Sequence, residues 1–571
     1  MDGSLNDRRV TQAQAELDRT EVSRSVALAL CGLLLVTTAW VPVAQVWVEP
    51  EVWRADLDTD IVSGGTDDQE RRTLVDQLVD QVVRSNRGLL AVIDTLTDQL
   101  DNESLLARRL RPVVQQVLTR LAGTGNELVY VGQNGWLFYA TDVRHVAGPG
   151  FLDARQLAKR AASGSTLELA PAPDPRPALL AFNAALAERG ITLVVMPTPV
   201  KPSIHPEHLA PRAEAAPIRN LSFDRFLDEM RAAGILIFDP APALVATRAA
   251  GHPAYLRADT HWRPEAVESV STALAEFLER AAVLPPREPV AFTTRTATVT
   301  GRGDTLDLLG LPDGWSPTAP DSVTVRQVLM PDGRLWAPSP TADILLLGDS
   351  FANIYSLDSL GWGRGAGLAE RLSLALGREV DRLSQNDNGA FATRVALARE
   401  LARDPARLAR TRVVVYQFTT RELSHGDWRL VPLAAPSRPG PQADQTVQSP
   451  RVLRPTPGRT MTVRGRVRQR TTAPRPGTVP YRDHIIAVEL TEIESTDPAI
   501  AIDGSVALVY LASMEDNVWT SAARLPAGAM VTLELRPWAA VAAEQEGITR
   551  TELIAGDVVF APPWWGELTT P

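Results

Sequence analysis

Three residues in the middle of the chain have the types needed for an activated serine nucleophile. Asp259 and His261 stand two positions apart, and Ser350 follows later in a Gly-Asp-Ser sequence. Such a set works when the serine attacks, the imidazole takes the serine proton, and the carboxylate orients the imidazole. The sequence therefore predicts an enzyme with Ser350 as nucleophile, His261 as base and Asp259 as the orienting acid.

The residues around these groups indicate how they would be positioned. The apolar run 344–347 leads directly into the Gly-Asp-Ser sequence, which is typical of a central parallel strand. Ligands of open α/β sheets bind at the carboxyl ends of such strands. Pro264 favours a helix that begins just after His261. We therefore expect the Asp-His pair on the loop that enters this helix.

The segment 127–433 alternates between strand and helix patterns, which predicts an α/β domain whose parallel sheet is flanked by helices. We expect this domain to carry the catalytic site. Its predicted strands are 128–131, 191–196, 235–238, 344–347 and 412–417, and its predicted helices are 177–189, 222–233, 264–280, 364–376 and 394–410.

A Pro-rich linker, 434–458, leads to a C-terminal stretch, 459–571, with an all-β pattern. A short helix within 514–525 would follow the third strand, which is the order of an OB-type barrel, although a small β-sandwich would show nearly the same pattern. The strand-like runs are 461–468, 485–490, 506–511, 530–535 and 552–560. Four tryptophans, which could stack on sugars, are expected instead in core packing: Trp519, Trp538, Trp564 and Trp565.

The N-terminal part has the pattern of a membrane anchor. Residues 25–48 contain no charged residue and would span a bilayer as a helix. Bases precede this segment in a leader, 1–24, and acids dominate the linker that follows, 49–68, which predicts a cytoplasmic N-terminus and an external remainder. A cleaved signal peptide is the alternative. Residues 69–126 carry apolar stripes typical of helices, expected as a hairpin packed on the catalytic domain or as a docking surface.

The composition excludes several classes of protein. A formal net charge of −10 without a basic stripe argues against a nucleic-acid partner. Cys31 is the only cysteine, so a disulfide framework is impossible and a cysteine-ligated metal site is not expected. His205 and His208 follow Pro-rich sequence with only Glu207 nearby. We therefore expect neither a metal nor another cofactor.

An ordered set of motifs resembles the alginate O-acetyltransferase family, whose members are periplasmic SGNH-hydrolase-like proteins that modify exopolysaccharides. The motifs are Gly-Trp-Leu-Phe-Tyr at 135–139, Pro-Thr-Pro-Val-Lys-Pro at 197–202, Asp-Thr-His-Trp at 259–262, Gly-Asp-Ser-Phe at 348–351 and Arg-Glu-Leu at 421–423. The resemblance covers about 128–428 of the chain. It implies an SGNH-like fold in which the Asp-His element precedes the serine, the reverse of the order in ordinary SGNH esterases.

The resemblance implies acetyl transfer by way of an acetyl group on Ser350, which a sugar hydroxyl then attacks after His261 has taken its proton. The Ser350 backbone N–H is the first expected donor to the oxyanion. SGNH enzymes add a glycine and an asparagine to it. Asn386 is the preferred candidate here, with Asn353 and Asn388 as the others. Formation of a turn is the alternative role for these asparagines.

Lys201, Arg421 and Trp362 are candidate substrate contacts, and a structural ion pair is the alternative for Lys201 and Arg421. The resemblance further implies a polysaccharide substrate and a multi-pass membrane O-acyltransferase as the partner that supplies acetyl groups. Together with the predicted anchor at 25–48, this places the chain in the inner membrane, with its catalytic domain in the periplasm or outside the cell. Two other functions stay open: a carbohydrate acetylesterase with the same triad, and a non-catalytic polysaccharide-binding scaffold subunit.

Overall fold

The computed structural model describes residues 105–163, 170–210 and 216–433, and also 451–569 apart from 457, 480, 497–501, 503, 546, 554–555 and 557. The predicted leader, the anchor at 25–48, the acidic linker and the Pro-rich segment 434–450 lie outside the described residues. Within the described ranges, no helix is both long and apolar enough to cross a membrane. The chain divides into two compact units, Met1–Val114 and Gln115–Pro571.

One helix of the predicted helical segment 69–126 is described. This helix, α4 (Leu105–Ala122), contains Pro112 and crosses the border between the two units. It ends before Gly123, whose φ of 62° is in the left-handed region that favours glycine at a helix end. The sequence predicted this helix and its end correctly. The rest of the fold described below lies in the second unit.

A five-stranded parallel sheet forms the centre of the catalytic domain. Its strand order is β4-β3-β9-β7-β8. All residues of β7 and β9 are buried, as expected for strands covered on both faces. The strands are β3 (Thr192–Thr198), β4 (Leu236–Ile237), β7 (Ile344–Gly348), β8 (Asp381–Ser384) and β9 (Val413–Thr419).

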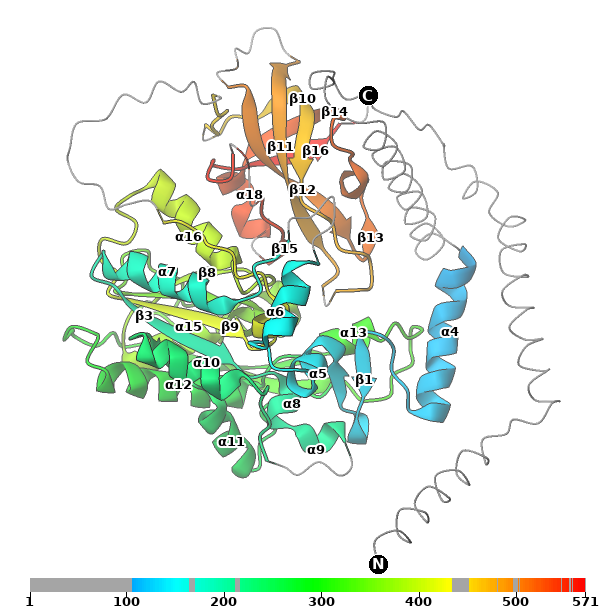
Figure 1. Cartoon of the computed structure of the whole chain (residues 1–571), viewed down its shortest axis with the longest axis vertical. Coiled ribbons are helices and arrows are strands. Elements are labelled where there is room, and N and C mark those ends of the chain that lie inside the picture. The colour runs from blue at the N-terminus through cyan, green and yellow to red at the C-terminus, as the bar shows by residue number, and fades with distance from the viewer. Residues whose placement is uncertain are drawn as a thin grey trace, which may run out of the picture. The chain divides into compact units, whose positions relative to one another are not determined.

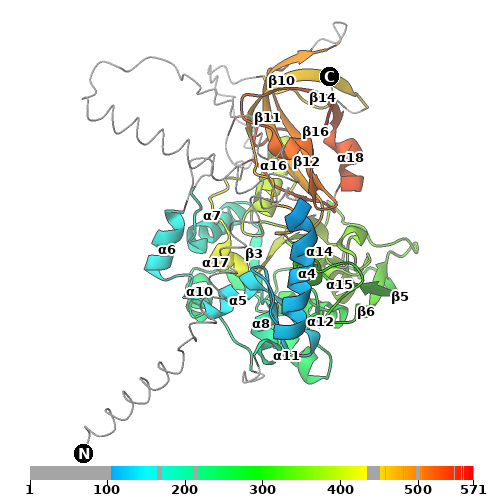
Figure 2. The ribbon, with the colours of Figure 1, turned by 90° about the vertical axis from the view of Figure 1, so that its right-hand side faces the viewer.

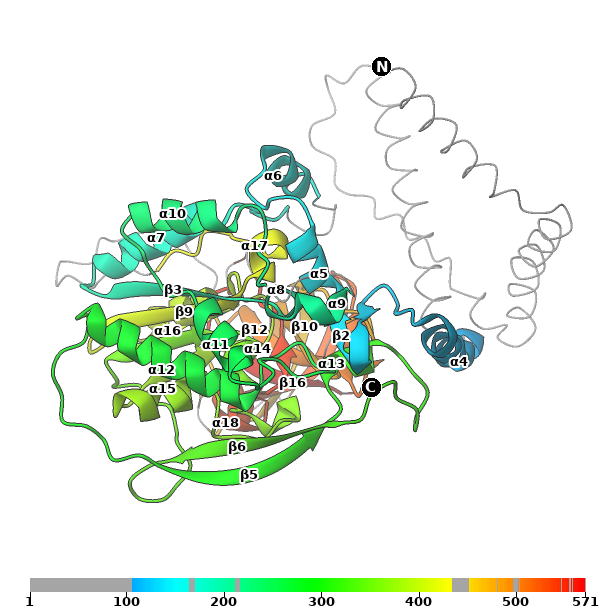
Figure 3. The same ribbon diagram turned by 90° about the horizontal axis from the view of Figure 1, so that it is seen from below.

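Helices cover both faces of this sheet, so alternate strand residues pack into two separate cores. Figure 3 shows the strands between the two helical layers. One core contains residues of α7 (Pro175–Ala187), α10 (Phe223–Ala232) and α16 (Ala392–Arg403). The other contains residues of α11 (Ala241–Ala249), α12 (Pro264–Arg280) and α15 (Leu368–Leu376). The predicted flanked parallel sheet is confirmed, and α12 has the predicted bounds.

Two ribbons of antiparallel strands lie outside the main sheet. The predicted strand 128–131 is not part of the parallel sheet, because β1 (Val129–Val131) pairs with β2 (Leu137–Tyr139) across the tight turn η2 (Gln133–Gly135). The other ribbon, β5 (Thr293–Gly301) with β6 (Asp321–Leu329), was not predicted. Its β-branched alternation in 293–300 was the available signal.

Short helices complete the catalytic domain, and several of them are labelled in Figure 1. They are α5 (Ala140–Ala147), α6 (Ala154–Ala161), α8 (Lys201–Ile204), α9 (Pro206–Leu209), α13 (Asp304–Leu308), α14 (Ser350–Asn353), η3 (Asp358–Leu360) and α17 (Arg421–His425).

The C-terminal domain is a small β-barrel (Figure 2). A ring of strands closes in the order β12-β16-β14-β10-β11, because β11 also pairs with β12. The short helix η4 (Ser521–Arg524) follows the third barrel strand, as predicted for an OB-type barrel rather than a sandwich. The ring strands are β10 (Met461–Arg470), β11 (His484–Ser495), β12 (Val506–Glu515), β14 (Met530–Pro537) and β16 (Trp564–Leu568); β13 (Val518–Trp519), α18 (Trp538–Gln545) and β15 (Thr549–Arg550) join them.

The prediction of the last barrel strand was wrong. The run 552–560 contains no described strand residue, and β16 closes the barrel instead. Leu553, Val558 and Val559 gave the run its apolar character, and all three are buried under the barrel without strand pairing. Trp564 and Trp565 are buried too, which confirms core packing for these two tryptophans.

A buried ion pair ties the barrel to the catalytic domain. Arg399 on α16 pairs with Glu552, and both side chains are almost completely buried. The same guanidinium donates to the Tyr510 hydroxyl over 2.9 Å and to the Val559 carbonyl over 2.5 Å. These bonds engage Nε and Nη1 of the guanidinium where water has little access.

Replacing Arg399 by Ala should therefore destabilise the chain by about 3–5 kcal/mol, because it leaves the Glu552 carboxylate buried opposite a cavity. Chemical denaturation of the full chain, followed by tryptophan fluorescence, measures this loss. Arg403→Ala is the matched control, since Arg403 lies one turn further along α16 and is exposed. Equal midpoints for the two variants would contradict a stabilising role for the Arg399–Glu552 pair.

Candidate active site

The nucleophile lies at the carboxyl end of the central strand β7. Gly348 ends the strand, Asp349 caps α14 by accepting a bond from the Phe351 amide, and Ser350 is the first residue of that helix. A Cβ on Gly348 would lie 2.4 Å from the Ala352 Cβ. Glycine is therefore required for the sharp turn that presents Ser350.

Asp349 fixes this turn to the neighbouring strand β9. Its carboxylate accepts bonds from the Gln417 amide (3.0 Å), the Thr419 backbone N–H (2.7 Å) and the Thr419 hydroxyl (2.5 Å). The Gln417 side chain in turn accepts the Asp349 N–H. Asp349 is thus saturated by structural bonds, and it does not serve as the acid that orients the histidine.

The three predicted catalytic residues come together. His261 Nε2 lies 2.8 Å from Ser350 Oγ, and His261 Nδ1 lies 2.6 Å from Asp259 Oδ1. All three residues are buried, with exposures of 7% or less. In neutral His261, a proton on Nδ1 would bond Asp259 and leave Nε2 free to accept the Ser350 proton. This arrangement can activate a serine for attack on an acyl group.

The charges of the pair support this assignment. Burial raises the pKa of Asp259, but the charge of His261 and the hydrogen bonds from His261 and Trp362 lower it to about 2. Burial lowers the pKa of His261, but Asp259 outweighs burial and raises it above 6.5. Asp259 is therefore ionised at neutral pH, and its charge favours the protonated form of His261 that arises when the base takes the serine proton.

Trp362 completes the bonding of the catalytic acid. Its Nε1 donates to Asp259 Oδ2 over 2.9 Å and its side chain is buried, while its contact with a substrate stays a prediction. The Asp304 backbone N–H donates to the same oxygen over 3.1 Å. Asp259 thus has a partner on each oxygen. Sequence reasoning missed both contacts, because neither residue stands in a recognisable motif with Asp259.

A cavity of about 280 Å³ opens beside Asp259 and His261. The catalytic domain and the barrel both line it, so the C-terminal domain takes part in shaping the site. The barrel side consists of 481–483 and 547–549, and the catalytic side includes 301–304, Asp307, Ile354 and 359–362.

The candidate oxyanion residues lie in the turn after β8. Asn386 accepts a bond from the Asn353 amide (3.0 Å) and donates to the Gly547 carbonyl of the barrel (3.1 Å). Asn388 has a φ of 54° and its carbonyl receives the Phe391 N–H, which is a turn role. Asn386 thus bonds Asn353 and the barrel, and its role as an oxyanion donor stays a prediction.

Lys201 is buried and does not line the cavity beside His261. Its side chain is 1% exposed, and Nζ donates to the carbonyls of Leu137 (2.6 Å) and Arg257 (3.2 Å). Burial lowers the pKa of Lys201 to about 8. The structure gives Lys201 a bracing role for two backbone segments, while contact with a substrate stays a prediction.

Arg421 forms a structural ion pair with Asp142, which was the alternative predicted for it. Its Nη1 lies 3.1 Å from Asp142 Oδ1, and its guanidinium stacks over the rings of Tyr139 and Phe351. Phe351 directly follows the nucleophile, so Arg421 packs against the turn that carries Ser350. The side chain keeps 16% exposure, and its contact with substrate remains a prediction.

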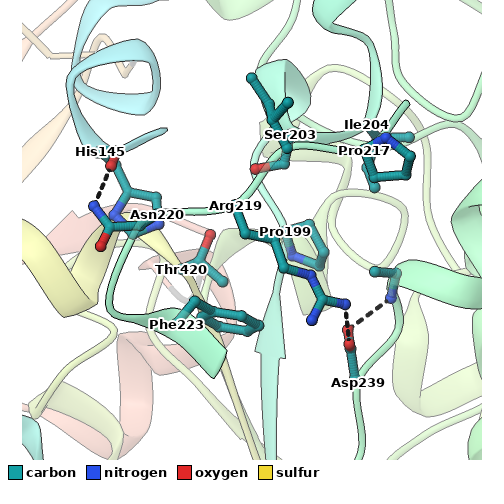
Figure 4. A pocket seen from close by; sticks show the side chains of 12 residues that line it. His145, Pro199, Ser203, Ile204, Pro217, Arg219, Asn220, Phe223, Asp239 and Thr420 are labelled. Atoms are coloured by element: carbon teal, nitrogen blue, oxygen red, sulfur yellow. Dashed lines mark hydrogen bonds and ion pairs between the residues drawn. The ribbon is translucent and has the colours of Figure 1, made fainter. Parts of the chain in front are cut away.

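A second serine–histidine contact occurs elsewhere in the catalytic domain. His145 Nδ1 lies 2.6 Å from Ser424 Oγ, but no carboxylate bonds His145 among the residues described. Burial lowers the pKa of His145 to about 3, which makes it a poor base. A small cavity of about 20 Å³, room for about one water, lies beside it (Figure 4). No triad residue lines this cavity.

His205, Glu207 and His208 lie close enough together to hold a metal. Both ring nitrogens of His205 are already engaged, however. Nδ1 lies 3.0 Å from Glu207 Oε1, and Nε2 accepts the Ala254 N–H over 3.1 Å. Metal binding at this cluster would have to break one of these bonds.

Comparison with known proteins identifies the family. Residues 129–420, just over half of the chain, match the family model described as "SGNH hydrolase-like domain, acetyltransferase AlgX". The chain belongs to this family. The predicted resemblance is thereby confirmed, and the prediction of an O-acetyltransferase enzyme is confirmed at the level of the family.

The individual relatives share only a modest sequence identity with this chain. A probable alginate O-acetylase AlgJ of Pseudomonas putida is 25% identical over 312 residues, which cover 53% of this chain and 72% of the relative. The Pseudomonas aeruginosa AlgJ is 32% identical over 189 residues, covering 33% and 42%. Among solved structures, the O-acetyltransferase domain of Pseudomonas putida AlgJ matches with 23% identity and a TM-score of 0.40, covering 52% of this chain and 93% of that one. Pseudomonas aeruginosa AlgX matches with 15% identity and a TM-score of 0.37, covering 60% and 77%.

The bond between Trp362 and Asp259 leads to a prediction. Trp362→Phe should slow acylation of the serine about three- to tenfold, since the catalytic carboxylate loses one donor but the core keeps its shape. Stopped-flow release of p-nitrophenol from p-nitrophenyl acetate measures this rate.

Trp336→Phe is the matched control. Trp336 is also buried, and its Nε1 donates to Ser373 over 2.8 Å rather than to the triad. Both variants should lose about 1 kcal/mol of stability, and only Trp362→Phe should lose rate. Equal rates in the two variants would show that the Trp362 bond has no part in catalysis.

Proposed function

We propose that this chain transfers acetyl groups to hydroxyls of an extracytoplasmic polysaccharide through an acetyl ester on Ser350. One observation carries the proposal: the continuous contact from Ser350 Oγ to His261 Nε2 (2.8 Å) and from His261 Nδ1 to Asp259 Oδ1 (2.6 Å). Membership of an acetyltransferase family supports the choice of the acetyl group.

In the first half-reaction, Ser350 Oγ attacks the carbonyl carbon of an acetyl donor while its proton moves to His261 Nε2. A tetrahedral oxyanion forms, and it collapses when the donor's leaving group departs with the proton from His261. The product is an acetyl ester on Ser350. The Ser350 backbone N–H and Asn386 are the proposed oxyanion donors, each worth roughly 3 kcal/mol in enzymes of this kind.

In the second half-reaction, a sugar hydroxyl loses its proton to His261 and attacks the acetyl-serine carbonyl. Breakdown of the second tetrahedral intermediate returns the proton to Ser350 and releases the acetylated sugar. Transfer requires that the sugar outcompete water. The cavity beside His261 has walls from two domains, so a sugar acceptor bound there would contact protein on both sides. Such binding supports transfer to the sugar over hydrolysis by water.

Alginate, or a related exopolysaccharide, is the proposed acceptor, because two relatives that are similar to part of this chain are described as probable alginate O-acetylases. We further propose that residues 25–48 anchor the chain in the inner membrane with its catalytic domain in the periplasm or outside the cell. The uncharged length of that segment and the preceding bases support this placement. A multi-pass membrane O-acyltransferase is the proposed source of acetyl groups.

The test uses the full chain with p-nitrophenyl acetate as donor and alginate oligosaccharides as acceptor. Mass spectrometry of the oligosaccharides should show added acetyl groups, and Ser350→Ala should lower their formation by about a thousandfold or more. Ser424→Ala is the matched control, because it removes the other serine that contacts a histidine, and it should keep wild-type transfer.

Two results would contradict the proposal. Acetylated oligosaccharide formed equally by Ser350→Ala would remove Ser350 from the reaction. Release of p-nitrophenol and acetate by the wild type, with no acetylated oligosaccharide from any acceptor tested, would favour the acetylesterase instead.

A further inference from the structure

We propose that Asp304 is a positioning residue of this site, with two roles. It holds the Asp259–His261 loop, and its ionised carboxylate stabilises His261 while His261 carries the Ser350 proton. The inference rests on the proposed function and adds a residue outside the Ser-His-Asp set. Nothing in the sequence motifs points to Asp304.

The hydrogen bonds of Asp304 converge on the catalytic loop. Its backbone N–H donates to Asp259 Oδ2 over 3.1 Å. Its own carboxylate accepts from the Thr260 N–H over 2.7 Å and from the Thr260 hydroxyl over 2.5 Å. Thr260 stands between Asp259 and His261, so one residue holds the acid directly and holds the histidine through its neighbour.

The backbone before Asp304 is built for this close approach. Gly303 has a φ of 90°, and a Cβ there would lie 2.1 Å from the Ala258 carbonyl oxygen. Only glycine allows the two segments to pass at this distance. The Leu306 N–H then bonds the same Ala258 carbonyl over 3.3 Å. The segment is therefore fixed to the catalytic loop on both sides of Asp304.

The Asp304 carboxylate also lies close enough to His261 for a direct electrostatic interaction. Asp304 Oδ2 is 3.7 Å from His261 Nδ1, and its side chain is only 9% exposed. Neutral His261 needs one carboxylate partner, and Asp259 supplies it. When His261 accepts the Ser350 proton, it faces two carboxylates, and the second one is weakly screened because water has little access.

The titration of Asp304 fits this role. Burial, followed by the charge of Asp259, raises the pKa of Asp304 to about 7. Burial lowers the pKa of His261, while the charges of Asp259 and Asp304 raise it above its usual value, so the protonation of His261 depends on the charge of Asp304. The charged and titratable groups facing Asp304 are Asp259, His261, Lys201, Arg302, Asp307, Arg482 and Asp483.

Asp304→Asn tests the charge, because asparagine keeps the size and one acceptor oxygen. Removing a negative charge near His261 lowers the pKa of His261, so the neutral base persists to lower pH. The acid limb of the pH–rate profile for acylation by p-nitrophenyl acetate should move down by about half to one pH unit. The plateau rate at high pH should fall about three- to tenfold, since the protonated base loses stabilisation.

Two further variants of the full chain sharpen the test. Thr260→Val removes a hydroxyl that helps keep Asp304 ionised, so it should shift the limb in the same direction by less. Thr260→Val also tests the role of Asp304 if the Asp304→Asn variant fails to fold. Asp313→Asn removes a charge from an exposed residue that does not line the cavity, so solvent screening should leave the limb nearly in place.

An unmoved acid limb in Asp304→Asn and Thr260→Val would overturn the inference, and so would an equal shift in Asp313→Asn. Either result leaves the proposed function standing, provided Ser350→Ala is inactive. If the wild type is never acylated, the proposed function fails. The His261 pKa is then measured by NMR of histidine labelled at ¹³Cε1, and only a lower value in Asp304→Asn would support the role of Asp304.

Discussion

A carboxylate buried away from water must have its charge and lone pairs satisfied by the protein. The arrangement of the whole site depends on meeting this requirement for Asp259. Burying an isolated ionised carboxyl group would cost many kcal/mol. One oxygen of Asp259 meets the backbone and ring N–H groups of His261. The other meets the Trp362 indole and the Asp304 backbone. These donors come from three segments far apart in the chain, so the fold must bring them together before His261 can act.

Two aspartates near the nucleophile do different work because their partners differ. Asp349, next to Ser350, is occupied by side chains and backbone of β9, and it holds the serine turn to the sheet. Asp259 comes from the loop before α12 and bonds the imidazole. The sheet therefore fixes the serine, and a separate loop fixes the base. The 2.8 Å contact between Ser350 and His261 joins the serine turn of the sheet to the loop that carries the base.

The sequence was sufficient where the signal was local. The run 344–347 ending in Gly-Asp-Ser and the proline after His261 located β7, α12 and the triad, since each pattern lies within a few residues. Trp362 and Asp304 could not be found this way, because their contacts with Asp259 depend on tertiary packing. The strand error at 552–560 has a similar cause, since buried apolar residues in a loop show the same pattern as a strand. The barrel order was predictable because the alternation in its other strands is strong.

The covalent intermediate tests the central claim most directly. The full chain is exposed briefly to an acetyl donor, quenched in acid, digested and mapped by mass spectrometry. A single acetyl group on Ser350, absent when His261 is replaced by Ala, is the expected result. Acetylation of Ser424 or of another residue, with Ser350 unmodified, would show that the contact between Ser350 and His261 is not the catalytic one.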